Sequence, residues 1–190
     1  NKMKSKDVVI LDTRKSSKYC AEHIPGSIFI GLDGRFAPWV GEIIKDINQE
    51  IILIVEKDRV EEAITRLSRV GFDNCIGYLD GDLKIWKSAG YATESIRSIS
   101  PEQFIKESHQ NSQIIDVREK PELSKGKFQS SINVPLSKID VKMKFDKNVN
   151  SYIYCAGGYR SVIACSIIKK NGLKKLVNVK TGFSGIKNLI

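Results

Sequence analysis

Long apolar runs are missing from this 190-residue chain. No stretch approaches the roughly 18 consecutive apolar residues that a bilayer-spanning helix needs. The opening residues, NKMKSKDVVILDTR, hold no apolar core of the kind found in secretory signals. We therefore expect a soluble, cytoplasmic protein with no membrane partner. The chain begins with Asn1 and enters a strand-like run within a few residues, which suggests a fragment of a longer protein.

Cysteine and histidine are also scarce. The four cysteines, Cys20, Cys75, Cys155 and Cys165, are too few for a disulfide scaffold and form no CxxC pair, so we expect reduced thiols. Cys20 and His23 have a CxxH spacing, but no second pair of ligands accompanies them, and we expect no metal site. Neither histidine of the chain falls beside Cys155 in the sequence, so a Cys–His catalytic pair is unsupported.

Acidic residues are scarce in the second half alone. Residues 1–97 contain 15 Lys+Arg and 15 Asp+Glu, whereas residues 98–190 contain 16 and 7, so the whole net charge of +9 arises there. Most of these lysines stand singly, without aromatic residues between them, which is typical of a solvated surface. We expect no nucleic-acid partner.

An internal repeat organises the chain. VVILDTRKSSKYCAEHIPGSIFIGL (8–32) lies over SQIIDVREKPELSKGKFQSSINVPL (112–136) without a gap, and RVEEAITRLSRVGF (59–72) lies over RSVIACSIIKKNGL (160–173). A period near 100 residues suits tandem globular domains, which we place at 1–97 and 98–190. Ser100 and Pro101 have the pattern of a helix N-cap followed by the first helical residue.

Each copy alternates short apolar, β-branched runs with helical periods. In the second copy we expect helices over 100–109, 160–172 and 182–190, and strands at QIIDV, SINVPL, SYIYC and LVNV. This alternation predicts an α/β fold in which each domain is a mainly parallel sheet covered by helices on both faces. Ligands of such folds bind outside the carboxyl ends of the strands, where Cys155 falls.

The segment CAGGYRS, Cys155–Ser161, joins a strand to a helix. Glycines there permit positive φ angles, successive amides can point inward, and the helix dipole adds partial positive charge. Arg160 contributes a forked cation. We expect an anion-binding loop around a sulfur that exists largely as thiolate, its nucleophilic form. Cys165 and Cys75 fit core positions, and the sequence leaves Cys20 undecided.

Cysteine phosphatases space the nucleophile and arginine as CxxxxxR, which is one residue longer than CAGGYR. The shorter loop favours a smaller cargo, such as the outer sulfur of a persulfide. Both copies resemble rhodanese domains, the sulfurtransferase modules: the second through CAGGYRS, IIDVR, SINVPL and GF, the first through LDTR, EHIPGSIFIGL and YLDGDLKIW. The segment HIPGSIFIGLDGRFAPWVG with the following CAGGYRS also resembles the C-terminal rhodanese pair of metallo-β-lactamase-fold fusion proteins, some of them persulfide dioxygenases.

The resemblance implies that Cys155 is the nucleophile and carries a sulfane sulfur from thiosulfate or a low-molecular-weight persulfide to a thiol, sulfite or cyanide. It implies no cofactor within this chain; iron or zinc would belong to an upstream metallo-β-lactamase-fold domain. The Arg160 side chain would assist an anionic donor, and the direction of the Ser161 hydroxyl is left open. Main-chain amides would hold the persulfide at Ala156, Gly157, Gly158, Tyr159 and Arg160.

Two departures matter. Many thiosulfate-using rhodaneses have a cationic residue directly after the cysteine, whereas this chain has Ala156, which weakens the case for thiosulfate. The first copy has EKDRVEE after its strand IILIV, so Glu56 or a neighbour stands in the nucleophile's place and a carboxylate there would repel thiolates. We expect that copy to be non-catalytic. Phe36 and Trp39 of its DGRFAPWVGEII segment could cover the core or form a docking surface.

Three other functions remain open. The first is a persulfide carrier or regulatory module that serves an upstream metallo-β-lactamase-fold domain with little turnover of its own. The second is a cysteine phosphatase, against which the short loop argues. The third is a regulatory domain that only docks a neighbour. Asp12 and Arg14 recur as Asp116 and Arg118, including in the copy without a loop cysteine, and this recurrence indicates a structural role.

Overall fold

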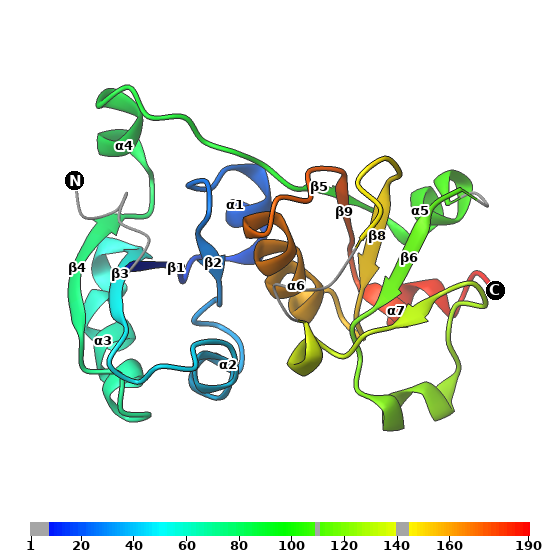
Figure 1. Ribbon diagram of the computed structural model, residues 1–190, viewed down its shortest axis with the longest axis horizontal. Helices are drawn as coiled ribbons and strands as arrows, with labels where there is room; N and C mark the ends of the chain where they lie inside the picture. Colours follow the sequence, from blue (N-terminus) through cyan, green and yellow to red (C-terminus); the bar gives the residue numbers. More distant parts are fainter. Residues whose placement is uncertain (1–7, 109–110, 140–144) are drawn as a thin grey trace. The chain divides into compact units, whose positions relative to one another are not determined.

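The computed structural model describes residues 8–108, 111–139 and 145–190. The chain forms two compact units, Asn1–Ser95 and Ile96–Ile190. Each unit is built around its own sheet, and every strand pair within both sheets is parallel (Figure 1). The predicted α/β class with one parallel sheet per copy is confirmed.

The first unit contains a four-stranded sheet with the order β2-β1-β3-β4. Its central strands β1 and β3 are buried runs of β-branched and aliphatic residues, as expected for strands covered on both faces. The elements are β1 (Val8–Asp12), α1 (Ser16–Ala21), β2 (Ile28–Phe29), α2 (Phe36–Ile43), β3 (Glu50–Val55), the 3₁₀ helix η2 (Lys57–Arg59), α3 (Val60–Ser68), β4 (Cys75–Asp80) and α4 (Lys84–Ser88).

The second unit contains a five-stranded sheet with the order β5-β9-β8-β6-β7. Helix α6 lies on one face of this sheet, while α5 and α7 contact each other on the other face (Figure 1). The elements are β5 (Arg97–Ile99), α5 (Pro101–Glu107), β6 (Gln113–Asp116), η3 (Lys120–Lys125), β7 (Ile132–Asn133), η4 (Leu136–Lys138), β8 (Ser151–Tyr154), α6 (Tyr159–Lys170), β9 (Leu176–Val179) and α7 (Gly182–Ile186).

Local signals placed most of these elements. The predicted cap is confirmed, since the Ser100 hydroxyl accepts a hydrogen bond from the Gln103 amide at 3.2 Å and Pro101 opens α5. Strand β5 was not expected. Its three residues include an arginine and a serine, and it forms because β9 offers an edge on which it pairs, with Ile99 opposite Val179.

Aromatic side chains fix β8 in the middle of its sheet. Tyr152 and Tyr154 are buried, and Phe104 of α5 packs edge-on against Tyr152 with 5.6 Å between ring centroids. Burying such a side chain contributes about 1.5–3 kcal/mol. The Tyr154 hydroxyl is satisfied by Ser131 Oγ at 2.9 Å, and burial raises the pKa of Tyr154 to about 12. Cys155, which follows β8 directly, is therefore attached to a strand that is held in place by its packing.

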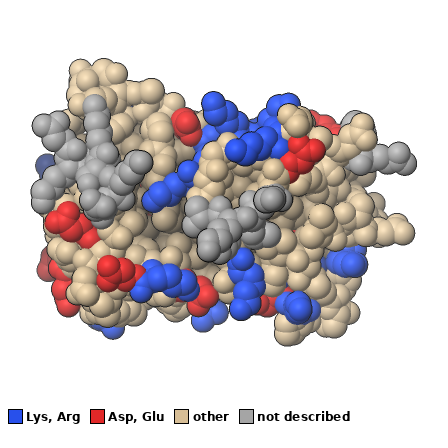
Figure 2. Space-filling model, viewed as in Figure 1, with Lys and Arg blue, Asp and Glu red and all other residues tan. Residues whose placement is uncertain are grey.

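Figure 2 shows lysine and arginine side chains in separate groups, with acidic side chains beside several of them. Mixed charges of this kind are typical of a solvated surface. Among the residues that the structure describes, no helix has both the length and the apolarity to cross a bilayer.

Candidate active site at the carboxyl end of β8

Strand β8 delivers Cys155 to the carboxyl edge of the second sheet. All four residues of the strand are buried, and β8 lies between β9 and β6. Cys155 follows directly and is 1% exposed. The loop from Cys155 to Gly158 then leads into α6, which starts at Tyr159. This is the edge at which ligands of parallel α/β sheets bind.

Gly158 turns the chain so that the start of α6 faces the sulfur. It has φ of 92°, in the left-handed region that favours glycine, and its N–H donates to Cys155 Sγ at 3.1 Å. A Cβ at this position would meet the backbone nitrogen of Thr181 at 2.9 Å. Gly157 is different, because it has no positive φ and an added Cβ would meet nothing within 4 Å. Only the second glycine of the pair is demanded by the fold.

The first turn of α7 holds the loop through two backbone hydrogen bonds. The Phe183 amide donates to the Cys155 carbonyl at 2.7 Å, and the Ser184 amide donates to the Ala156 carbonyl at 3.0 Å. In a trans peptide the C=O and N–H groups point in opposite directions, so the amides of Ala156 and Gly157 point away from α7. Gly182 permits this close approach, since a Cβ there would overlap the Cys155 carbonyl oxygen.

Ser161 faces the loop, which the sequence could not decide. It is fully buried in the first turn of α6, and the Cys155 thiol donates to its Oγ across 3.7 Å. When the sulfur is a thiolate, the hydroxyl can turn and donate to it instead. The Gly158 amide and the Ser161 hydroxyl therefore both contact the sulfur.

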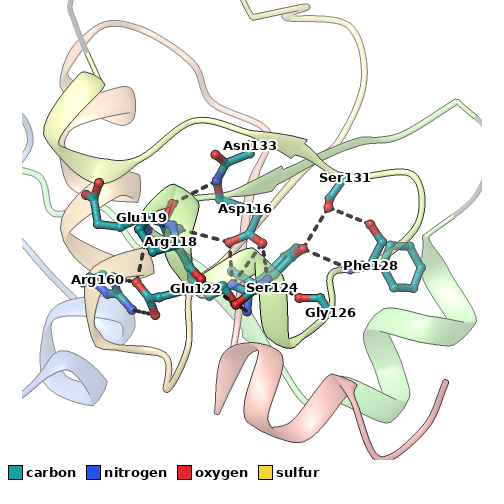
Figure 3. A network of polar contacts seen from close by, with 12 residues as sticks. Asp116, Arg118, Glu119, Glu122, Ser124, Gly126, Phe128, Ser131, Asn133 and Arg160 are labelled. Atoms are coloured by element: carbon teal, nitrogen blue, oxygen red, sulfur yellow. Dashed lines mark hydrogen bonds and ion pairs between the residues drawn. The ribbon is translucent and has the colours of Figure 1, made fainter.

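Arg160 is held by a residue that the sequence analysis missed. Its two terminal nitrogens lie 2.5 Å and 2.7 Å from the two carboxylate oxygens of Glu122, on η3 (Figure 3). The hydrogen bond to Glu122 is the main cause that raises the Arg160 pKa, and the charge of Cys155 raises it further. The same bond lowers the pKa of Glu122. The capping box that Glu119 and Glu122 form accounts for the start of η3, and no local sequence signal pointed to the contact with Arg160.

The buried ion pair between Arg118 and Asp116 supports η3. Arg118 Nη2 lies 2.6 Å from Asp116 Oδ2 and also donates to the Gly126 carbonyl at 2.9 Å (Figure 3). The Arg118 guanidinium stacks over the Phe183 ring at 4.1 Å from the centroid. Arg14 and Asp12 form the same 2.6 Å pair in the first unit. The structural role predicted for the repeated Asp-x-Arg pattern is confirmed.

The first unit has Val55 where the second has Cys155. Asp12 pairs with Ile54 across β1 and β3, as Asp116 pairs with Tyr154 across β6 and β8, so the next residues correspond. Glu56 follows and bonds Lys18 at 2.7 Å. A pocket of about 410 Å³ lies at these strand ends, lined by Arg14, Lys15, Lys18, Asp33, Glu56, Asp58 and Arg59.

The other cysteines lie apart from this loop. Cys20 and Cys165 are buried and Cys75 is half-buried, and none of the four cysteines is in a disulfide. Burial raises the pKa of the Cys75 thiol. Within the three described ranges, no three His, Cys, Asp or Glu side chains gather as a metal-binding group.

The structure also places three of the four remaining residues that the sequence singled out. Phe36 is fully buried in α2, with the Arg66 guanidinium 5.4 Å from its ring centroid, whereas Trp39 is half-buried. His23 is buried and stacks on Tyr19 at 4.2 Å. His109 lies outside the described residues.

Comparison with known proteins identifies the same family in both halves of the chain. The model of the rhodanese-like domain matches residues 1–89 and 100–189. The uncharacterized protein YqhL of Bacillus subtilis is 32% identical over 96 residues, 49% of this chain and 74% of YqhL. The putative sulfur carrier protein YrkF of the same species is 35% identical over 91 residues, 46% of this chain and 49% of YrkF.

A third relative has a name that states an activity. The putative mitochondrial thiosulfate sulfurtransferase of Schizosaccharomyces pombe is 37% identical over 79 residues, which are 34% of this chain and 56% of the relative. The chain therefore spans about half the length of YrkF and of the yeast protein. A crystal structure of a rhodanese-like domain protein from Staphylococcus aureus is 33% identical, covers 48% of this chain and 91% of its own, and has a TM-score of 0.42.

Proposed function

This chain belongs to the rhodanese-like family, and from that premise we propose that it is a sulfurtransferase that works through a persulfide on Cys155. The donor is thiosulfate or a low-molecular-weight persulfide, and the acceptor is a thiol, sulfite or cyanide. One observation carries the proposal: the Cys155 sulfur accepts the Gly158 amide at 3.1 Å at the N-terminus of α6. A donor at this position stabilises negative charge on sulfur.

Loading takes one displacement at sulfur. The Cys155 thiolate attacks the outer sulfur of a persulfide R–S–SH, the sulfur–sulfur bond of the donor breaks, and the thiolate RS⁻ leaves with the electron pair, so the enzyme becomes Cys155–S–SH. With thiosulfate, sulfite leaves as the dianion and the enzyme becomes Cys155–S–S⁻. In this proposal the amides of Ala156 and Gly157, whose peptide carbonyls are held by α7, donate to the added sulfur.

Unloading is a second displacement at the outer sulfur. An acceptor thiolate R′S⁻ attacks the outer sulfur of Cys155–S–S⁻, the sulfur–sulfur bond to Cys155 breaks, and R′–S–S⁻ leaves while Cys155 regains its thiolate. Charge balances in both steps and no electron acceptor is required. These steps use no cofactor. We assign catalysis to the second unit alone, because Val55 stands at the corresponding position of the first.

A carrier or regulatory module is the second candidate. It is favoured by the similarity to YrkF, whose name is that of a putative sulfur carrier, and by the burial of Cys155, which leaves 1% of the residue exposed. In this alternative a partner enzyme, such as a metallo-β-lactamase-fold domain upstream in the same polypeptide, loads or unloads the persulfide. The chain alone would then load one sulfur and turn over slowly.

Intact-mass spectrometry tests both candidates. The chain is exposed to thiosulfate and, separately, to glutathione persulfide, and we expect the gain of one sulfur atom that cyanide removes. Cys155→Ser should abolish the gain, whereas the matched variant Cys75→Ser should retain it, because Cys75 is a half-buried cysteine that lies outside the loop. A label on another cysteine, or no label, would overturn the proposal.

Steady-state kinetics with the same donors separates enzyme from carrier. Multiple turnover with cyanide or a small thiol supports the sulfurtransferase, and stoichiometric loading without turnover supports the carrier. A phosphatase would instead hydrolyse an aryl phosphate in a reaction that depends on Cys155, and we expect no such hydrolysis.

A further inference from the structure

Arg160, which should attract an anionic donor, is already occupied. Both of its terminal nitrogens bond Glu122, at 2.5 Å and 2.7 Å, and the two side chains are 19% and 33% exposed (Figure 3). A two-pronged arginine–carboxylate pair uses the same donors that would grip a sulfonate or a sulfite. A donor that needs these nitrogens must therefore displace a carboxylate.

Glu122 is fixed where it stands. Its Oε2 also accepts the Glu119 amide at 3.1 Å, which closes the capping box of η3, and its carbonyl accepts a bond from Arg118 at 3.4 Å. Arg118 is itself locked to the buried Asp116. The carboxylate thus belongs to a connected network rather than to a mobile surface side chain.

A second carboxylate acts on the same guanidinium. The charge of Glu119 contributes to the raised pKa of Arg160, and its Oε1 accepts the Ser137 hydroxyl at 3.1 Å. An incoming donor therefore meets one guanidinium and two carboxylates. Thiosulfate brings two negative charges and releases dianionic sulfite, whereas a hydropersulfide reacts with at most one charge on its sulfur. Like charges brought together at close range repel.

We propose that Glu122 sets the donor selectivity of the Cys155 loop: by occupying both terminal nitrogens of Arg160 it disfavours dianionic donors and leaves hydropersulfides as the preferred substrates. The inference rests on the proposed sulfurtransferase function. Ala156, which adds no cation, acts in the same direction. Glu122 is a specificity-determining residue that acts through Arg160, and it takes no part in the displacement itself.

The decisive variant is Glu122→Gln. Glutamine keeps the length of the side chain and an oxygen for the Glu119 amide. It has no charge, and its amide group has one acceptor oxygen, so one terminal nitrogen of Arg160 loses its partner. We measure the single-turnover rate of sulfur loading on the full chain with thiosulfate and with ethyl hydropersulfide, which carries no other charged group. The thiosulfate rate divided by the hydropersulfide rate should rise roughly 10- to 100-fold, the range of one hydrogen bond to a charged group.

The chain offers a matched control. Glu107 holds Arg97 through the same two-pronged geometry, at 2.7 Å and 2.5 Å, and Arg97 opens β5 at the amino end of the sheet, opposite the Cys155 edge. Glu107→Gln should leave the ratio unchanged. The double variant Glu122→Gln/Arg160→Gln should lose the gain, because the effect passes through Arg160.

The outcomes separate this inference from the proposed function. If the unaltered chain loads sulfur from neither donor, the proposed function fails. If it loads, and Glu122→Gln leaves the ratio unchanged or the double variant keeps the gain, the assignment of Glu122 is wrong while the sulfurtransferase stands. Thermal unfolding checks the variants. Should Glu122→Gln unfold, Glu122→Asp replaces it: the carboxylate keeps its charge but is set back from Arg160 by one methylene, which weakens the pair, and we expect a smaller rise in the same ratio.

Discussion

Replacement of Gly158 by alanine tests whether the loop is built as described. The residue has φ of 92°, and an L-residue in the left-handed region costs roughly 1–2 kcal/mol. The new Cβ would also meet the Thr181 nitrogen at 2.9 Å, so backbone must shift. Together we expect a loss of roughly 2–3 kcal/mol in the free energy of unfolding of the second unit. For a domain of this size that lowers the melting temperature by about 10 °C or more.

Gly157→Ala is the control for this change. It adds the same methyl group one residue earlier in the same loop, where φ is not positive and nothing lies within 4 Å of the new atom. Its effect should lie between none and a gain of about 1 kcal/mol, because alanine restricts the unfolded chain. The Gly158 variant should also load sulfur more slowly, since its shifted amide no longer lies 3.1 Å from the sulfur.

Two optical probes separate the units in one sample. Both tryptophans, Trp39 and Trp86, belong to the first unit, so tryptophan fluorescence follows that unit alone. Far-UV circular dichroism follows both. Gly158→Ala should move the dichroism transition and leave the fluorescence transition in place. Equal shifts for the alanine variants at 157 and 158 would refute the reasoning from φ and contact distance.

Three further outcomes are expected. Ser161→Ala should slow single-turnover loading by up to about tenfold through loss of one hydroxyl near the sulfur, whereas Ser166→Ala, a buried serine of the same helix whose hydroxyl donates to a backbone carbonyl at 2.7 Å, should not. The lowered pKa of Glu122 means that its carboxylate stabilises the fold above its ordinary pKa of 4.5. At pH 7 the urea midpoint of Glu122→Gln should therefore fall below that of the unaltered chain. The difference between the two midpoints should close as the pH falls through the lowered pKa. Val55→Cys should place a thiol at the corresponding strand end of the first unit. Mass spectrometry should detect no sulfur added to it, because the Glu56 carboxylate follows it.

Contiguous signals explain what the sequence could predict. The strand, the loop cysteine and the helix start occupy one run of residues, so the spacing from Tyr152 to Ser161 determines their arrangement. The repeat likewise predicted two copies of one parallel sheet, because β-branched runs alternate with helical periods in both. Local propensity and global fold agree in these segments.

Non-local contacts explain what it could not predict. Glu122 and Arg160 are separated by 38 positions, and nothing in either local pattern states that the guanidinium faces η3. The clamp by α7 is similar, since the Phe183 amide reaches the Cys155 carbonyl across 28 positions of chain. Strand β5 exists only because β9 offers an edge. Pairing across the sheet decides such features, and a single sequence does not encode it in adjacent residues.

The two copies differ in charge as well as in the loop cysteine. The ungapped repeat places Lys18 at the position of Glu122, and each residue bonds the loop of its own unit: Glu122 to Arg160, and Lys18 to Glu56 at 2.7 Å. The bridge is thus kept while its polarity is reversed, so the Cys155 loop carries the cation and the loop of the first unit carries the carboxylate. A thiolate is stabilised beside the one and destabilised beside the other. The absence of a cysteine from the first copy and the reversed bridge therefore act in the same direction, and placing a cysteine at Val55 without reversing Lys18 and Glu56 should leave the first unit without sulfur loading.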